Sequence, residues 1–139
     1  MHCVNAPTDA LHGEQVGVAT LLLLDKYRNV TNPPLTKKPL SRDYLAPIYG
    51  DLTEGILKEN LPFIPDTISE EIRIKNWDEI RRLADEELPS PEWVADFLRS
   101  KGGKTTLADL ALPDTEAFLA TTLTYAPYAR NRLTLLKLL

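Results

Sequence analysis

The chain has little of what marks several large classes of protein. Its 139 residues include a single cysteine, Cys3, so no disulfide can form within the chain, which fits a reducing compartment. The longest apolar run, Val16 to Leu24, is far shorter than the roughly 20 residues that cross a bilayer. The N-terminus has no basic segment ahead of an apolar one, so a secretory signal peptide is not expected. The net charge of −4 argues against a nucleic-acid or anionic-membrane partner. We therefore expect a cytoplasmic protein with no membrane and no nucleic-acid partner.

Standard phosphate-binding and nucleophilic motifs are also missing. The stretch Gly102-Gly103-Lys104-Thr105 superficially looks like the end of a phosphate-binding loop. It lacks the earlier glycine at the required spacing, and it does not follow a predicted strand. No serine or cysteine nucleophile arrangement is visible, and nothing persuasive near Cys3 would activate its thiol.

Prolines, by contrast, are frequent, and they organise the chain. Most of the 11 prolines lie between apolar periodic segments rather than inside them, which is typical of an all-helical domain. No segment shows sustained strand alternation. We therefore predict an all-α, irregular multi-helix bundle that forms a single domain over residues 1–139. Within it, residues 1–11 are expected to be a loop or a truncation stub.

Two helical regions are predicted in the first half of the chain. The segment Glu14 to Arg28 is apolar on nearly every side, so we expect a central, buried helix, with a buried strand as the alternative. The segment Ser41 to Glu59 is a second helix or a broken pair, because Pro47 and Gly50 interrupt its helical periodicity.

The second half of the chain predicts four more helices and one short helical turn. The first runs from a capping box of Thr67 and Glu70 to about Leu88, with Trp77 on its apolar face and a solvated charged face over 78–87. The next begins at a Ser-Pro-Glu signature and ends near a glycine. The residues assigned to helix packing there are Trp93, Val94, Phe97 and Leu98. The regions that follow are a short turn over 106–110, a helix capped at Asp114 or Thr115 that ends near Pro127, and an apolar helix over 128–138.

The compact polar constellation at residues 11–18 contains the best candidate for chemistry. His12 lies before, or in the first turn of, the most apolar helix. Neutral imidazole is the commonest metal ligand, and backbone N–H groups at a helix start can hold an anionic substrate. A capping or surface histidine is the competing interpretation, because a metal site needs three or four ligands and the chain offers no obvious second one. A cluster of His2, Cys3 and His12 has no recognised zinc spacing.

Residues 11–20, Leu-His-Gly-Glu-Gln-Val-Gly-Val-Ala-Thr, resemble the His-Gly-Glu-x-Val segment of the iron-containing alcohol dehydrogenase and dehydroquinate synthase superfamily. The form with Gln15 before Val-Gly-Val is most similar to the sn-glycerol-1-phosphate dehydrogenase branch. Three further stretches agree in order. They are Trp-Asp-Glu-Ile at 77–80 with Leu-Pro-Ser-Pro at 88–91, Gly102-Gly103 with a Thr-Leu-Ala-Asp turn, and Arg-Asn-Arg-Leu-Thr at 130–134. The last is similar to the branch's closing Arg-x-Arg-Tyr-Thr motif, from which Leu133 departs. The resemblance spans nearly the whole chain.

The resemblance implies an NAD(P)-dependent oxidoreductase that interconverts dihydroxyacetone phosphate and sn-glycerol 1-phosphate, with this chain as its helical, metal-binding C-terminal domain. His12 matches the second of two histidines that, with an aspartate, ligate a divalent metal: zinc, nickel or iron. The other two ligands, and the domain that binds most of the NAD(P), are expected upstream of Met1. Gln15 is a candidate substrate contact, and a structural hydrogen bond in the first turn is the alternative.

The implied partners are a small phosphorylated polyol and the missing nucleotide-binding domain, and a homo-oligomer is left open. The isolated chain is expected to be inactive, because one histidine cannot hold a catalytic metal. Two alternatives remain: a glycerol or alcohol dehydrogenase of the same superfamily, and a non-catalytic helical interaction module whose apolar face meets another chain.

Overall fold

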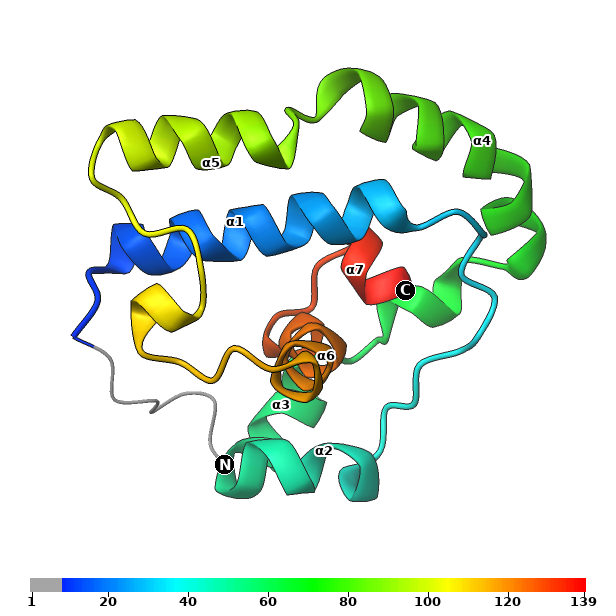
Figure 1. Ribbon diagram of the computed structural model, residues 1–139. Helices are drawn as coiled ribbons and strands as arrows, with labels where there is room; N and C mark the ends of the chain where they lie inside the picture. The colour runs from blue at the N-terminus through cyan, green and yellow to red at the C-terminus, as the bar shows by residue number, and fades with distance from the viewer. Residues whose placement is uncertain (1–8) are drawn as a thin grey trace. The chain divides into compact units, whose positions relative to one another are not determined.

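The computed structural model describes residues 9–139, and this part of the chain contains helices, 3-10 turns and loops but no strand (Figure 1). The predicted all-α, irregular helical bundle is therefore confirmed. The seven α-helices within residues 9–139 are α1 (His12–Asn29), α2 (Arg42–Tyr49), α3 (Thr53–Glu59), α4 (Glu70–Glu87), α5 (Pro91–Ser100), α6 (Glu116–Tyr125) and α7 (Leu135–Leu138). Short 3-10 turns lie at Gly50–Leu52, Ile64–Thr67, Ala108–Leu110 and Ala126–Ala129. None of the helices in residues 9–139 combines the length and the apolar character needed to cross a membrane.

The described residues divide into two compact units. The first comprises Pro33–Lys75 and Glu116–Leu139, and the second comprises 9–32 and Asn76–Thr115. Helix α4 begins in the first unit and ends in the second. The single domain expected over 1–139 stays a prediction. His2, Cys3 and most of the expected stub lie outside the described residues.

The first unit is built around a buried cluster of Leu45, Tyr49, Phe63 and Tyr128. The rings of Phe63 and Tyr128 are stacked, with centroids 5.9 Å apart. Both buried tyrosine hydroxyls have backbone acceptors: Tyr49 donates to the carbonyl of Tyr125 at 2.6 Å, and Tyr128 donates to that of Pro39 at 2.8 Å. The cluster is therefore packed through its aromatic rings, and the hydroxyl of each buried tyrosine has a hydrogen-bond acceptor.

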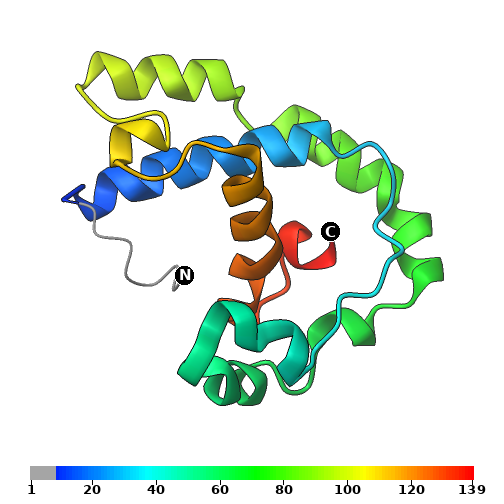
Figure 2. The same cartoon turned by 60° about the horizontal axis from the view of Figure 1, so that its bottom comes forward.

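The predicted broken pair over 41–59 is confirmed, and the break lies at Gly50. Ser41 caps α2, because its hydroxyl oxygen accepts the N–H of Tyr44 at 3.3 Å. Pro47 lies inside α2 without ending it. The helix ends where Gly50 takes a φ of 52°, a conformation that glycine adopts without steric cost. The chain then turns into α3, which lies beside α2 (Figure 2).

In the second unit, α5 runs alongside α1 in the opposite direction (Figure 1). The close approach falls at Gly17, where a Cβ atom would lie only 3.3 Å from the Leu98 side chain. Helix α1 buries a single stripe, Val18, Leu21 and Leu24, while Val16 remains 49% exposed. The expected burial of α1 on nearly every side is therefore wrong, because apolar composition does not show how many sides have a neighbour.

Helix α5 begins as predicted but presents a different face. Ser90 caps it by accepting the N–H of Trp93 at 3.1 Å, and Gly102 follows its end with a φ of 73°. Trp93 and Phe97, both assigned to packing, are instead 63% and 51% exposed. They precede Val94 and Leu98 by one residue, which turns them about 100° away from the packed side. The expected burial of Trp77 is confirmed, at 5% exposed.

Two predicted helix boundaries are wrong. The capping box of Thr67 and Glu70 does not form: Thr67 donates to the carbonyl of Ile64 inside a 3-10 turn, and Ser69 accepts the N–H of Ile72. The closing helix was predicted over 128–138, but the α-helix there is only α7, because residues 130–134 are not helical. Lys137 explains part of this, because its ammonium donates to the Arg130 carbonyl. In a continuous helix that carbonyl would accept a backbone N–H instead.

Candidate functional site

His12 is the first residue of α1, as the sequence predicted, and its side chain is exposed. Leu11 is the N-cap residue and has an extended backbone. A leucine side chain cannot accept the hydrogen bonds that Ser, Thr, Asp or Asn would accept there. None of the described residues forms a hydrogen bond or an ion pair with the His12 imidazole. The ring is therefore available to a ligand from outside residues 9–139.

The residues that follow His12 hold the first turn of α1 in place. The Glu14 carboxylate accepts the N–H of Leu11 at 2.9 Å and lies 3.5 Å from the Lys104 ammonium. The Gln15 side-chain amide donates to the carbonyl of Ala10 at 3.0 Å. This bond is the first-turn structural contact that was the alternative to a substrate contact. The substrate contact at Gln15 stays a prediction.

The acidic side chain of Glu14 also suits its position in the helix. It lies in the first turn, where the helix dipole favours negative charge. Lys104 reaches it from the loop that follows α5, so the start of α1 and the end of α5 are joined by charge as well as by packing. Both side chains are about a quarter to a third exposed, so this pair contributes modestly to stability.

The metal site implied by the resemblance is not complete within the described residues. No group of three His, Cys, Asp or Glu side chains in residues 9–139 is placed to hold an ion. His12 therefore supplies one candidate ligand, and a metal needs at least two more protein ligands. The described residues alone do not fit a catalytic metal.

The glycine pair after α5 belongs to a structural turn, because Gly102 and Gly103 donate their backbone N–H groups to the carbonyls of Arg99 and Leu98. Both Thr105 and Thr106 donate their backbone N–H groups to the Asp109 carboxylate, each at 3.0 Å. The Thr105 bond first, and those of Thr106 after it, lower the pKa of the Asp109 carboxyl. Since an acidic side chain of the same chain occupies these amides, they cannot cradle a phosphate. This agrees with the sequence-based rejection of a phosphate loop.

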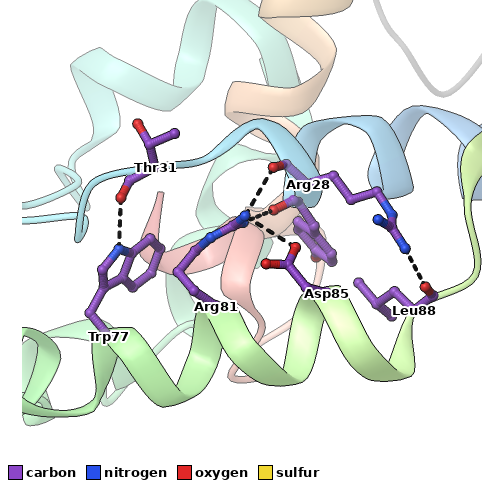
Figure 3. A network of polar contacts seen from close by, with 7 residues as sticks. Arg28, Thr31, Trp77, Arg81, Asp85 and Leu88 are labelled. Atoms are coloured by element: carbon purple, nitrogen blue, oxygen red, sulfur yellow. Dashed lines mark hydrogen bonds and ion pairs between the residues drawn. The ribbon is translucent and has the colours of Figure 1, made fainter.

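An arginine network in the second unit was missed by the sequence analysis (Figure 3). Arg81 donates to the carbonyls of Tyr27 and Arg28, at 2.7 and 3.1 Å, and pairs with Asp85 at 3.2 Å. Arg28 in turn donates to the Leu88 carbonyl at 2.6 Å. The two arginines thus satisfy carbonyls at the ends of each other's helices, which otherwise lack intrahelical partners. The expected solvated face over 78–87 is wrong at Arg81, whose side chain is only 21% exposed.

A buried polar cluster in the first unit was missed as well. Lys137 and Asn60 are both fully buried, and the Lys137 ammonium donates to the Asn60 side-chain oxygen and to the Arg130 carbonyl. The Asn60 amide nitrogen donates to the carbonyls of Ile56 and Tyr128, at 2.8 and 2.7 Å. Burial lowers the pKa of Lys137, and the charge of Glu59 partly opposes this shift. The cluster joins α3, the turn before Arg130 and α7 through one ammonium group.

The closing Arg-x-Arg stretch forms no site of its own among residues 9–139. The side chains of Arg130 and Arg132 are exposed, and so is Leu133, the residue that departs from the family pattern. The residue between the arginines is the one with long-range contacts: Asn131 donates to the carbonyl of Pro62 at 3.0 Å.

Comparison of the chain with protein-family models, with curated proteins and with solved structures finds no match. A functional assignment therefore depends on the geometry at the start of α1 and on the similarity of its sequence.

Proposed function

We propose that this chain is the C-terminal helical part of a cytoplasmic, metal-dependent NAD(P) oxidoreductase that interconverts dihydroxyacetone phosphate and sn-glycerol 1-phosphate. The observation that carries the proposal is His12 at the first position of α1, exposed and without a hydrogen bond to the described residues. This position leaves the ring accessible to a metal, and a surface histidine is the competing interpretation that the tests below address. The resemblance of residues 11–20 supplies the family, the substrate and the role of the ring.

The part that these residues play in the proposed reaction is to present one imidazole from a fixed position. Metal ligands must be held closely in place, and helices do this better than loops. The first turn of α1 meets this need through Glu14, which accepts the N–H of Leu11, and Gln15, which donates to Ala10. The remaining ligands and the nicotinamide site would come from residues outside 9–139.

The first test is to sequence the coding locus upstream of Met1. An open, in-frame stretch that encodes alternating strands and helices, an aspartate ligand and another histidine would support the proposal. A genuine start site with nothing upstream would contradict it.

The second test measures activity in a protein that joins this chain to such an upstream segment. We expect metal-dependent NAD(P)H oxidation with dihydroxyacetone phosphate, and negligible activity from the 139-residue chain alone. His12→Ala should lower kcat/KM by at least about 100-fold, because a catalytic ion with two protein ligands is poorly held. His2→Ala is the matched control, with no large loss expected. Wild-type activity in His12→Ala would refute the assigned role.

A second candidate function is favoured by one observation on α5. The exposed aromatic side chains of Trp93 and Phe97 are what a non-catalytic helical interaction module would present to another chain. Full activity of the joined protein would exclude this as the sole function.

A further inference from the structure

Two tyrosines from distant parts of the chain lie ring against ring in the first unit. Tyr44 lies in the first turns of α2, and Tyr125 is the last residue of α6. Their ring centroids are 5.0 Å apart, and the ring planes are inclined by 31°. Both rings are half-buried and pack against the buried cluster of the first unit, so each is held in place on one side. We call Tyr44 and Tyr125 the tyrosine pair.

The hydroxyl ends of the tyrosine pair also meet. Tyr44 shares a side-chain hydrogen bond with Tyr125. The oxygens of such a bond lie within about 3 Å of each other, which brings the ring carbons next to each hydroxyl-bearing carbon close together. Burial first, and then the charge and the hydrogen bond of Tyr125, raise the pKa of the Tyr44 phenol. Tyr44 therefore keeps its hydroxyl proton at neutral pH.

We propose that the tyrosine pair is an oxidative modification site, at which the two rings become joined as an intramolecular dityrosine. The oxidant is a strong one-electron acceptor, such as the carbonate radical anion or a Ru(III) complex, and two molecules of it are consumed. Each phenol gives one electron to an oxidant and its hydroxyl proton to water, which leaves a phenoxyl radical that shares its unpaired electron with the neighbouring ring carbons. One such carbon of each ring forms the new C–C bond. The hydrogen on each of these carbons then moves to the oxygen of the same ring, which restores both phenols.

The other tyrosines of the first unit are shielded from this reaction. Tyr49 and Tyr128 are buried, and each donates its hydroxyl to a backbone carbonyl instead of to another tyrosine. The ring of Tyr128 meets that of Tyr44 edge to face, at 61° and 6.0 Å between centroids. An oxidant in solution therefore reaches the half-buried tyrosine pair before the buried rings. This site does not depend on the proposed dehydrogenase function, since it involves neither His12 nor a nucleotide domain.

The test exposes the dilute 139-residue chain to light, ruthenium tris-bipyridine and persulfate. We expect a monomeric product that has lost two hydrogen atoms in mass, shows dityrosine fluorescence and yields a peptide pair joined between Tyr44 and Tyr125. Tyr44→Phe should abolish this product, because phenylalanine has no hydroxyl hydrogen to give up. Tyr27→Phe is the matched control, since Tyr27 belongs to the second unit, and it should leave the yield unchanged. A wild-type chain that forms no such product, or a product that persists in Tyr44→Phe, would overturn the proposal.

Two further measurements show whether the folded geometry directs the reaction. Oxidation in concentrated urea should give much less of the joined product, because the rings no longer lie side by side, and an equal yield would refute a preformed site. The purified product should unfold at a higher urea concentration than the untreated chain, because the new bond restricts the unfolded chain between α2 and α6. A lower midpoint of unfolding would mean that the rings leave their native positions to couple, and it would also refute the proposal. Circular dichroism of Tyr44→Phe before oxidation shows whether its helices are intact.

Discussion

Replacing Lys137 with methionine tests whether a buried ammonium group stabilises the first unit. The side chain is fully buried, its Nζ atom lies 5.5 Å from the centre of the Phe63 ring, and it donates to the Asn60 side-chain oxygen and to the Arg130 carbonyl. Methionine keeps most of the apolar stem but offers no donor. The variant therefore removes the hydrogen bonds and the charge while changing the packing little.

Two opposing effects decide the magnitude. Hydrogen bonds from a charged donor contribute about 1.5–3 kcal/mol each, so losing the bonds to Asn60 and Arg130 costs about 3–6 kcal/mol. Removing a buried charge returns part of this, because the ammonium is no longer desolvated. We expect the loss of the hydrogen bonds to outweigh this gain, since the Asn60 side-chain oxygen is left in a buried place without its donor. The net loss is about 2 kcal/mol in the free energy of unfolding, or roughly 8 °C in Tm.

Urea unfolding, monitored by circular dichroism, measures this loss as a lower urea concentration at the midpoint of unfolding. Lys58→Met is the control, because Lys58 is exposed in the same unit, and we expect a change of less than about 0.5 kcal/mol there. A double-mutant cycle with Asn60→Ala should give a coupling energy above about 1 kcal/mol. A Lys137→Met variant as stable as wild type would show that desolvation cancels the hydrogen bonds, and it would refute this reasoning.

Three further results are expected. Arg81→Met should lower the free energy of unfolding by about 2 kcal/mol, because the carbonyls of Tyr27 and Arg28 lose their donor; urea midpoints will check this, and an unchanged midpoint would contradict it. Gly102→Ala should cost about 1 kcal/mol by the same assay, since Gly102 has a φ of 73° that alanine adopts only with strain, and a neutral result would contradict it. Finally, the stability difference between wild type and Lys137→Met should change in favour of wild type as pH rises towards about 10.4, the ordinary pKa of a lysine side chain. Burial lowers the pKa of Lys137 in the folded state, so the unfolded state binds the proton more strongly over this interval and stability rises with pH. A difference that is flat or falls over the same pH range would refute the lowered pKa.

Local sequence patterns predicted the elements whose causes are local. The start of α5 follows from a capping serine and a proline at the first helical position, both of which act within a few residues. The break after α2 follows from Gly50, whose backbone takes a conformation that other residues avoid. His12 at the start of α1 was likewise predictable, because the apolar run that begins after it marks the helix.

The features that were missed depend on distant partners. Arg81 belongs to a run of charges with helical spacing, which indicates a solvated face, but its acceptors lie 53 and 54 residues earlier in the chain. Lys137 and Asn60 are 77 residues apart, and nothing in a closing apolar segment predicts that its lysine is buried. Trp93 and Phe97 were assigned to the wrong face of α5 for another reason. Residues 93, 94, 97 and 98 are all apolar, so two adjacent stripes fit the same periodicity and only the neighbour, α1, selects between them.

The contacts along α1 bear directly on the proposed role of His12. The helix is held near its start by the Glu14–Lys104 pair, further along by the packing of Gly17 on Leu98, and at its end by Arg81. A helix that is held at three places along its length gives its first residue a defined position. A metal ligand needs such a position. A purely structural helix would use the same contacts, so fixation alone does not distinguish the two roles. The imidazole at the exposed tip of α1 is accessible, and the resemblance of residues 11–20 is what suggests a ligand role for it. If the His12 ring binds nothing in the joined protein, the fixation of α1 serves packing alone.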